Sequence, residues 1–228
     1  MAWTLVPAAI LIYIAVAQVD TWANIKYESR KQHTESKTGA SLQVAVSARQ
    51  FEWRMRYPSV KRFKMWQENK ADHNGAFDSF GRVPQADDVY VVNELHIYQE
   101  HQVVVYLTTR DVIHSFNLPN FRVKQDALPG KMIPVWFITK KDYACWNTTW
   151  DEDKQRYVDG IDPSTGKPAV DANGNPSKEF IYDIPCAELC GWGHYRMIGR
   201  VFVHKDKDDF LKWLEKAEAN TNLRTSDR

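Results

Sequence analysis

The sequence is poor in cysteine, and neither sign of charge is in excess. Three cysteines in 228 residues are too few for the disulfide framework that supports small secreted domains. The 30 basic and 29 acidic residues give a formal net charge of +1, so the composition does not indicate a nucleic-acid partner. The length suits one domain of ordinary size with an additional segment.

Long apolar runs are also scarce, and the one that exists lies at the N-terminus. No charged residue occurs between Met1 and Val19, and tryptophans flank the run at Trp3 and Trp22. A membrane-spanning helix needs about 20 such residues with aromatic side chains at the two interfaces. We therefore predict a transmembrane helix over residues 1–23. A cleaved signal peptide is the alternative, but the basic segment that would begin one is missing.

The basic residues after this run, Lys26, Arg30 and Lys31, would by charge alone place the remaining chain in the cytoplasm. A single short helix with no charged loop before it gives that rule little to act on. The orientation is therefore inferred from the site described below.

The rest of the chain favours a β-rich domain. Residues 24–40 are polar and read as a linker. Short alternating runs separated by glycine and proline then predict an all-β sandwich or barrel over residues 41–205. A turn-rich stretch at about 142–178 reads as a surface insertion. An apolar face within Asp206–Ala219 predicts a C-terminal helix, followed by a frayed tail to residue 228. The predicted strands are Leu42–Ser47, Gln50–Tyr57, Asp88–Asn93, Gln102–Thr109, Arg122–Lys124, Met132–Thr139, Phe180–Asp183 and Gly199–His204.

A metal-binding pattern lies near the C-terminal end of this domain. Cys186 and Cys190 are followed by His194 and Met197, whereas the third cysteine, Cys145, lies apart and is interpreted as a bystander. Thiolate and thioether are soft ligands that suit copper far better than magnesium, calcium or manganese.

The spacing helps to separate the candidate metals. Structural zinc sites usually pair two C-x2-C elements, and a blue single-copper site uses one cysteine. Two cysteines bridging two copper ions would use both thiols, and each ion would then need an imidazole and a weak axial ligand. Met197 is one axial candidate. His114, expected on a loop leaving the strand Gln102–Thr109, is the candidate for the second imidazole.

Two segments together resemble subunit II of cytochrome c oxidase, in the haem–copper oxidase family. They are DVIHSFNLPNFRVKQDALPGK, beginning at Asp111, and PCAELCGWGHYRM, beginning at Pro185. The N-terminal run also resembles the second transmembrane helix of that subunit. The resemblance implies a cupredoxin-like Greek-key β-barrel that carries the binuclear copper centre CuA. The implied metal ligands are His114, Cys186, Glu188 through its backbone carbonyl, Cys190, His194 and Met197.

The resemblance also implies a function and partners. The subunit accepts electrons from cytochrome c at CuA and passes them to haem in subunit I, which reduces dioxygen to water and pumps protons. Subunit III is a further implied partner, and a magnesium ion shared with subunit I would involve Glu188. The β domain would lie on the periplasmic or intermembrane side of a bacterial plasma membrane or mitochondrial inner membrane. This chain alone would have no oxidase turnover.

Alternatives remain for the function. The quinol-oxidase branch lacks the copper ligands, and nitrous oxide reductase would not have this membrane helix. A CuA subunit of a related respiratory enzyme, such as a nitric oxide reductase, stays open. A non-redox domain, such as a copper chaperone or zinc scaffold, is the remaining alternative of another class.

The sequence departs from the family in three respects. The family usually has two transmembrane helices, and this chain begins at the second. It could be a single-helix variant, a split subunit or an incomplete sequence. Phe51 stands where the family has the tryptophan that receives the electron, and Trp53 follows two residues later, so both are candidate electron-transfer residues. Basic residues such as Arg54, Arg56 and Lys61 predict a non-standard docking surface for the electron donor.

Overall fold

The computed structural model describes residues 2–23, 25, 41–68, 83–139, 148–151, 156–159 and 182–226. Helix α1 spans Ala2–Ala23 and is long and apolar enough to cross a membrane. Its side chains from Trp3 to Trp22 are exposed around the whole helix, as a lipid-facing helix requires. Length and composition alone would also fit a signal sequence.

The larger sheet of the β domain has five strands in the order β3-β2-β1-β5-β8. Central strand β1 pairs in parallel with β5 and antiparallel with β2. The outer pairings, of β2 with β3 and β5 with β8, are antiparallel. The strands are β1 (Leu42–Arg49), β2 (Glu52–Tyr57), β3 (Val89–Val92), β5 (Gln102–Thr109) and β8 (Ile133–Ile138).

The second layer consists of a three-stranded sheet, in the order β11-β12-β4, and the separate hairpin β6-β7. Phe116 of β6 forms an isolated bridge with Cys186, directly after β11, so the hairpin adjoins this sheet. The elements are β4 (Glu94–Tyr98), β6 (His114–Leu118), β7 (Val123–Ala127), β11 (Tyr182–Pro185) and β12 (Ile198–His204), with the 3-10 turn η2 (Pro119–Phe121) inside the hairpin.

One apolar core fills the space between the layers, and it contains side chains from both sheets. Trp53 lies completely buried within it, with its ring edge against Phe116 at a centroid distance of 5.4 Å. The indole N–H of Trp53 donates to the Ile184 carbonyl at 3.1 Å, so this buried donor is satisfied. Cys186 and Cys190 belong to the same core. The candidate site is therefore an edge of the core and not a separate surface feature.

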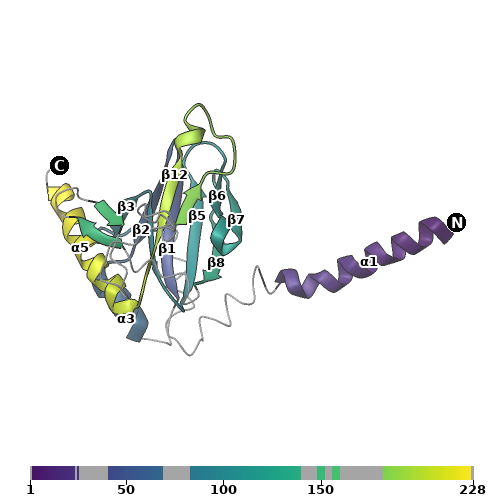
Figure 1. Cartoon of the computed structure of the whole chain (residues 1–228), viewed down its shortest axis with the longest axis horizontal. Helices are drawn as coiled ribbons and strands as arrows, with labels where there is room; N and C mark the ends of the chain where they lie inside the picture. The colour runs from purple at the N-terminus through teal and green to yellow at the C-terminus, as the bar shows by residue number, and fades with distance from the viewer. Residues whose placement is uncertain are drawn as a thin grey trace, which may run out of the picture.

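Two helices cover the domain on the side away from the β6-β7 hairpin, as Figure 1 shows. Helix α3 spans Val60–Glu68 and helix α5 spans Lys207–Ser226. The Trp213 ring of α5 makes an edge contact with the Tyr57 ring at a centroid distance of 5.0 Å. It stacks on the His96 ring at a centroid distance of 3.8 Å. The apolar face predicted for the C-terminal helix is thus the face that packs on the domain.

The predicted fold class is confirmed, with differences in several elements. Strand β4 was not predicted because Leu95 to Tyr98 are all buried, which removes the alternation that marks a half-exposed strand. Helix α3 was also missed. His114 was expected on a loop, and this was wrong: it is the first residue of β6, which pairs with β7 from His114 opposite Ala127.

The stretch predicted as a loop at 142–178 contains a short hairpin, formed by β9 (Thr148–Asp151) and β10 (Arg156–Asp159). The remainder of that insertion, Cys145, and the linker apart from Ile25 lie outside the described residues.

Candidate metal centre

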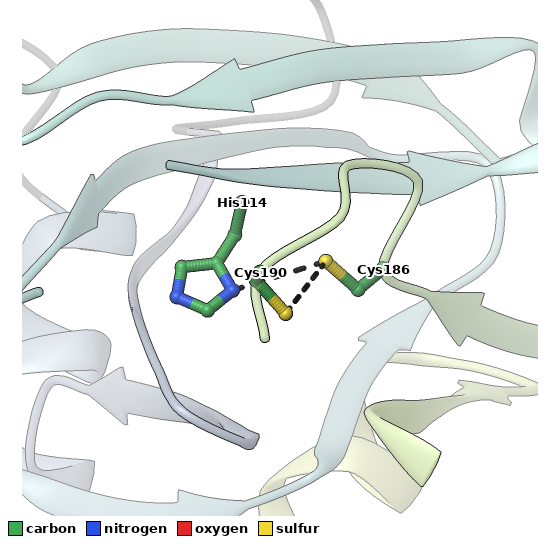
Figure 2. A group of neighbouring side chains, drawn as sticks. All are labelled: His114, Cys186 and Cys190. Carbon is green, nitrogen blue, oxygen red and sulfur yellow. Dashed lines mark hydrogen bonds between the residues drawn. The ribbon is translucent and has the colours of Figure 1, made fainter. Parts of the chain in front are cut away.

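The structure brings together the donor groups that the sequence places far apart. The Cys186 and Cys190 sulfurs are 3.9 Å apart, and Nδ1 of His114 lies 3.8 Å from the Cys186 sulfur. Figure 2 shows this imidazole pointing toward the two thiols. Within the part of the chain that the structure describes, these three residues form the cluster of metal-ligating groups with mutually close donor atoms.

Two further predicted ligands lie on the Cys190 side. Nδ1 of His194 is 3.6 Å from the Cys190 sulfur, and the Met197 sulfur is 3.8 Å from it. On the other side, the Glu188 carbonyl oxygen lies 3.3 Å from the Cys186 sulfur, while its side chain is exposed. Each thiol therefore has one imidazole and one weak donor beside it.

Asp111 orients the His114 imidazole through a contact with Nε2, the ring nitrogen that does not face the Cys186 sulfur. Nε2 of His114 lies 2.8 Å from Oδ1 of Asp111, and an ionised carboxylate can only accept, so Nε2 is the donor in this hydrogen bond and Nδ1 is the nitrogen that faces the thiols. Burial alone would raise the pKa of Asp111. The hydrogen bonds from the Gln50 amide, His114 and the Val112 amide outweigh this, and the pKa falls below its usual value. Asp111 thus orients the imidazole with Nδ1 toward the Cys186 sulfur.

The ligand loop between β11 and β12 is fixed by backbone hydrogen bonds. The Cys186 N–H donates to the Met197 carbonyl at 3.0 Å, and the Ala187 N–H donates to Ser115 in β6 at 3.0 Å. Near its end, the single 3-10 turn His194–Arg196 (η4) directs His194 and Met197 back toward Cys190. These backbone hydrogen bonds therefore fix the positions of the donors on the loop.

The turn between β1 and β2 supports the same loop. Gln50 donates through its side-chain amide to the Cys190 carbonyl at 2.6 Å, and through its backbone N–H to Asp111 at 2.7 Å. A Cβ on Gly193 would lie 2.4 Å from the Phe51 ring, so glycine is needed for this close approach. Sequence reasoning missed Gln50, and no sequence signal marks it, because its role depends on a contact across 140 positions.

The thiols are buried and reduced. Burial raises the pKa of the Cys190 thiol to about 11, and the neighbouring Cys186 adds to the shift. Both cysteines are free. A buried pair of free thiols with two imidazoles and a thioether fits a soft or borderline metal ion, because bound thiolates are stabilised by the cation that replaces their protons.

Trp53 and Phe51, the two aromatic candidates, differ in position. Trp53 lies in the core with its ring 6.2 Å from His114. Phe51 precedes strand β2, is half-buried, and lies against the ligand loop at Gly191 and Gly193. Both are near the donor cluster, and neither is a fully exposed side chain.

We predict that replacing Asp111 with asparagine lowers copper affinity about 10- to 100-fold, as expected when the group that orients a ligating histidine is altered. The asparagine side chain could still form a hydrogen bond with His114. Its neutral amide would not favour a proton on Nε2 of the ring as the Asp111 carboxylate does. Competition with a chelator of known copper affinity would measure the change. The control is Asp126→Asn, whose exposed side chain lies in β7. Equal affinities of the Asp111 variant and the unaltered chain would contradict the prediction.

Comparison with known proteins gives the same family that the sequence resembles. Residues 42–149 match the family described as cytochrome C oxidase subunit II, periplasmic domain. This segment contains His114 but ends before the cysteine loop. The matched domain and the mostly β architecture with its two terminal helices agree with the predicted cupredoxin-like fold.

Individual relatives are similar at low identity. The alternative cytochrome c oxidase subunit 2 of Bradyrhizobium diazoefficiens is 28% identical over 60% of this chain and 36% of its own length. Cytochrome c oxidase subunit 2 of Thermostichus vulcanus is 25% identical over 95% of this chain and 59% of its own length. Less than two thirds of these relatives is therefore covered. The solved periplasmic domain of cytochrome oxidase subunit II from Bradyrhizobium japonicum aligns with 78% of this chain and 94% of its own, at 21% identity and a TM-score of 0.47.

Proposed function

We propose that this chain, a member of the cytochrome c oxidase subunit II family, is the electron-accepting subunit of a terminal respiratory oxidase. It would receive electrons from cytochrome c at a binuclear copper centre and pass them to haem in subunit I. Reduction of dioxygen to water, coupled to proton pumping, would take place in that partner. The observation that supports the proposal is the convergence of two thiols, two imidazoles and a thioether at the edge of the core.

The donor set supports two metal ions better than one. A single copper ion of the blue type would use one cysteine and would leave the second buried thiol without a role. The described arrangement provides two similar halves, with His114 and the Glu188 carbonyl beside Cys186, and His194 and Met197 beside Cys190. When bound, the copper pair would supply a one-electron redox couple shared over both ions and both sulfurs.

The protein contributes a fixed and dry setting for that couple. His114 and Met197 are buried, and the loop backbone is hydrogen-bonded to β6 and to itself. Donors that are already in place need little movement when the charge of the centre changes, and little movement favours fast electron transfer. Asp111 and Gln50 add support from outside the ligand set, as in other metal sites whose ligands are oriented by neighbouring groups.

The location and partners follow from the same proposal. Helix α1 would anchor the chain as a single transmembrane span in a bacterial plasma membrane or mitochondrial inner membrane. The β domain would face the periplasm or intermembrane space. Subunit I would bind the domain, subunit III would be a further component, and the exposed Glu188 side chain would help to hold a magnesium ion at the boundary with subunit I.

The full chain, purified in detergent and loaded with copper, tests the proposal through its copper content and its electron paramagnetic resonance spectrum. We expect two copper ions per chain and a hyperfine pattern from one electron shared equally by two copper nuclei. One copper ion with the pattern of a single nucleus would indicate a mononuclear site. Tight zinc binding without copper would indicate a structural site. Either result would contradict the proposal.

A further inference from the structure

Trp192 is an exposed tryptophan inside the ligand loop. It lies two positions after Cys190 and two before His194, and 75% of its surface is exposed. Leu189 in the same loop is 78% exposed. Exposed large apolar side chains gathered on one loop are a feature of interaction surfaces. The same loop carries Cys186, Cys190, His194 and Met197.

The Trp192 ring is held in place, although it is exposed. Its edge packs against Phe51 at a centroid distance of 5.3 Å, and the Arg196 guanidinium lies 4.5 Å from its centroid. The same guanidinium lies 5.7 Å from the Phe51 ring. Aromatic and cation–π contacts of this kind each contribute about 0.5–1 kcal/mol at exposed sites. A ring fixed in this way loses little conformational entropy when a partner binds it.

The position of Trp192 distinguishes it from the aromatic residues proposed from the sequence. Trp53 is completely buried, and Phe51 lies behind the glycines of the ligand loop. A docking protein would meet Trp192 before either of them. The covalent path from Trp192 to either Cys190 or His194 crosses a single intervening residue, so contact at the indole is also contact close to the ligands.

The charges around Trp192 favour an acidic partner. Four arginines lie on the ligand loop, in the turn between β1 and β2, or next to that turn, against three carboxylates. The arginines are Arg49, Arg54, Arg110 and Arg196, and the carboxylates are Glu52, Asp111 and Glu188. Glu52 pairs with Arg49 and Arg54, and Asp111 accepts hydrogen bonds from Gln50 and His114. The net positive charge would attract an acidic docking face and repel a basic one.

We propose that Trp192 is the contact residue for the electron donor and that the donor is a cytochrome with an acidic docking face. This rests on the proposed function of the centre. In the step itself one electron would leave the donor's haem iron(II), which becomes iron(III), and would reduce by one electron the copper pair that Cys186 and Cys190 would hold. No bond is formed or broken, and no proton is transferred.

A matched pair of donors tests the charge. Reduced mitochondrial-type cytochrome c, which is basic, and the same protein with succinylated lysines, which is acidic, carry the same haem. With the copper-loaded full chain, we expect the acidic form to bind more tightly and react faster, with both advantages declining as salt is added. Faster reaction of the basic form, with a steep fall in added salt, would overturn the proposal.

Variants test the residue. Trp192→Ala should weaken binding of the succinylated cytochrome by about tenfold or more, as for an aromatic hot spot, with copper content and resonance spectrum unchanged. Trp192→Phe should recover part of this loss. Tyr90→Ala is the control, because Tyr90 is also an exposed aromatic residue but lies in β3, outside the ligand loop, and it should leave binding unchanged. Binding is measured by fluorescence or calorimetry as well as through the reduction rate.

The outcomes separate this inference from the proposed function. A normal copper pair with unchanged donor binding in Trp192→Ala would overturn the role of Trp192 and leave the proposed function standing. The same would hold if the variant lost only its association with the catalytic subunit, because Trp192 would then be buried in the complex. Absence of the copper pair would overturn both proposals.

Discussion

Replacing Cys186 or Cys190 with serine is expected to eliminate the two-copper centre. The Cys186 sulfur lies beside His114 and the Glu188 carbonyl, the Cys190 sulfur lies beside His194 and Met197, and the two sulfurs are 3.9 Å apart. In the proposed centre both thiolates would be shared by the two ions. A serine hydroxyl is a hard ligand that does not ionise near neutral pH and cannot replace a bridging thiolate. Copper content should fall from two ions per chain to one at most, and the spectrum of the shared electron should disappear.

The third cysteine provides the control for this experiment. Cys145→Ser should keep both copper ions, since Cys145 was interpreted as a bystander and is not needed by the donor cluster. Circular dichroism of the metal-free variants would show whether the β domain is still folded, because burying a hydroxyl in place of a thiol costs about 1–3 kcal/mol if the hydroxyl lacks a partner. A folded Cys190→Ser chain with two copper ions and the shared-electron spectrum would contradict the proposed centre.

The second large effect concerns the pH dependence of stability and arises at His96. His96 is completely buried and stacks between Trp213 and Phe202. Burial lowers its pKa well below the usual 6.5, and the neighbouring His204 lowers it further. His96 is therefore neutral in the folded chain at pH values where it would be protonated in the unfolded chain.

The sign of the effect follows from this difference in bound protons. Below about pH 6.5 the unfolded state binds a proton at His96 that the folded state does not, so acidification lowers the free energy of unfolding. The slope is at most about 1.4 kcal/mol per pH unit until the pH approaches the lowered folded pKa. The prediction is a loss of stability between pH 6.5 and 5.5, measured by urea unfolding of the metal-free full chain in detergent.

Titratable groups near His96 also affect how the free energy of unfolding depends on pH. Glu94 lies 3.4 Å from His96, and burial raises its pKa above 4.5. Its stabilising effect is present below pH 4.5 and is lost as the pH rises through its folded pKa, which opposes the slope from His96. His204 and Asp209 complete the hydrogen-bonded chain, and the lowered pKa of Asp209 affects stability only below its usual value of 3.8.

Two variants isolate the contribution of His96. Glu94→Gln removes the opposing titration, and we expect a steeper loss of stability on acidification in this variant. Adding His96→Gln to it removes the buried imidazole, and the slope between pH 6.5 and 5.5 should become nearly flat. An unchanged slope after His96 is replaced would assign the acid sensitivity to another group.

The sequence alone was enough to predict most of the proposed donor set, because the soft ligands are close together in the chain. Cys186, Cys190, His194 and Met197 fall within one short segment, and the chemistry of these four side chains is enough to exclude most metals. The apolar N-terminal run and the β-rich domain could also be predicted from the sequence, because the spacing of apolar residues and the positions of turn residues are local properties. The C-terminal helix was recognised for the same reason.

Elements without a local signature were not recognised. Strand β4 is buried on both faces and shows no alternation. His114 was selected by its sequence neighbourhood, yet its place as the first residue of β6 depends on pairing with Ala127. Gln50 and Asp111 support the centre through hydrogen bonds to residues distant in sequence or in another element. Such contacts exist only after the chain has folded.

The sequence by itself determined the kind of chemistry available to this protein: soft donors, one long apolar helix and a β domain large enough to bury a core. The tertiary structure alone decided how that chemistry is arranged. It brought His114 close to Cys186, 72 positions away in the sequence. It also buried Trp53 in the core and left Trp192 exposed to solvent. Residue type fixes what an atom can bind, which is a local property. Which atoms meet, and which face solvent, depends on packing between strands that are remote in the chain.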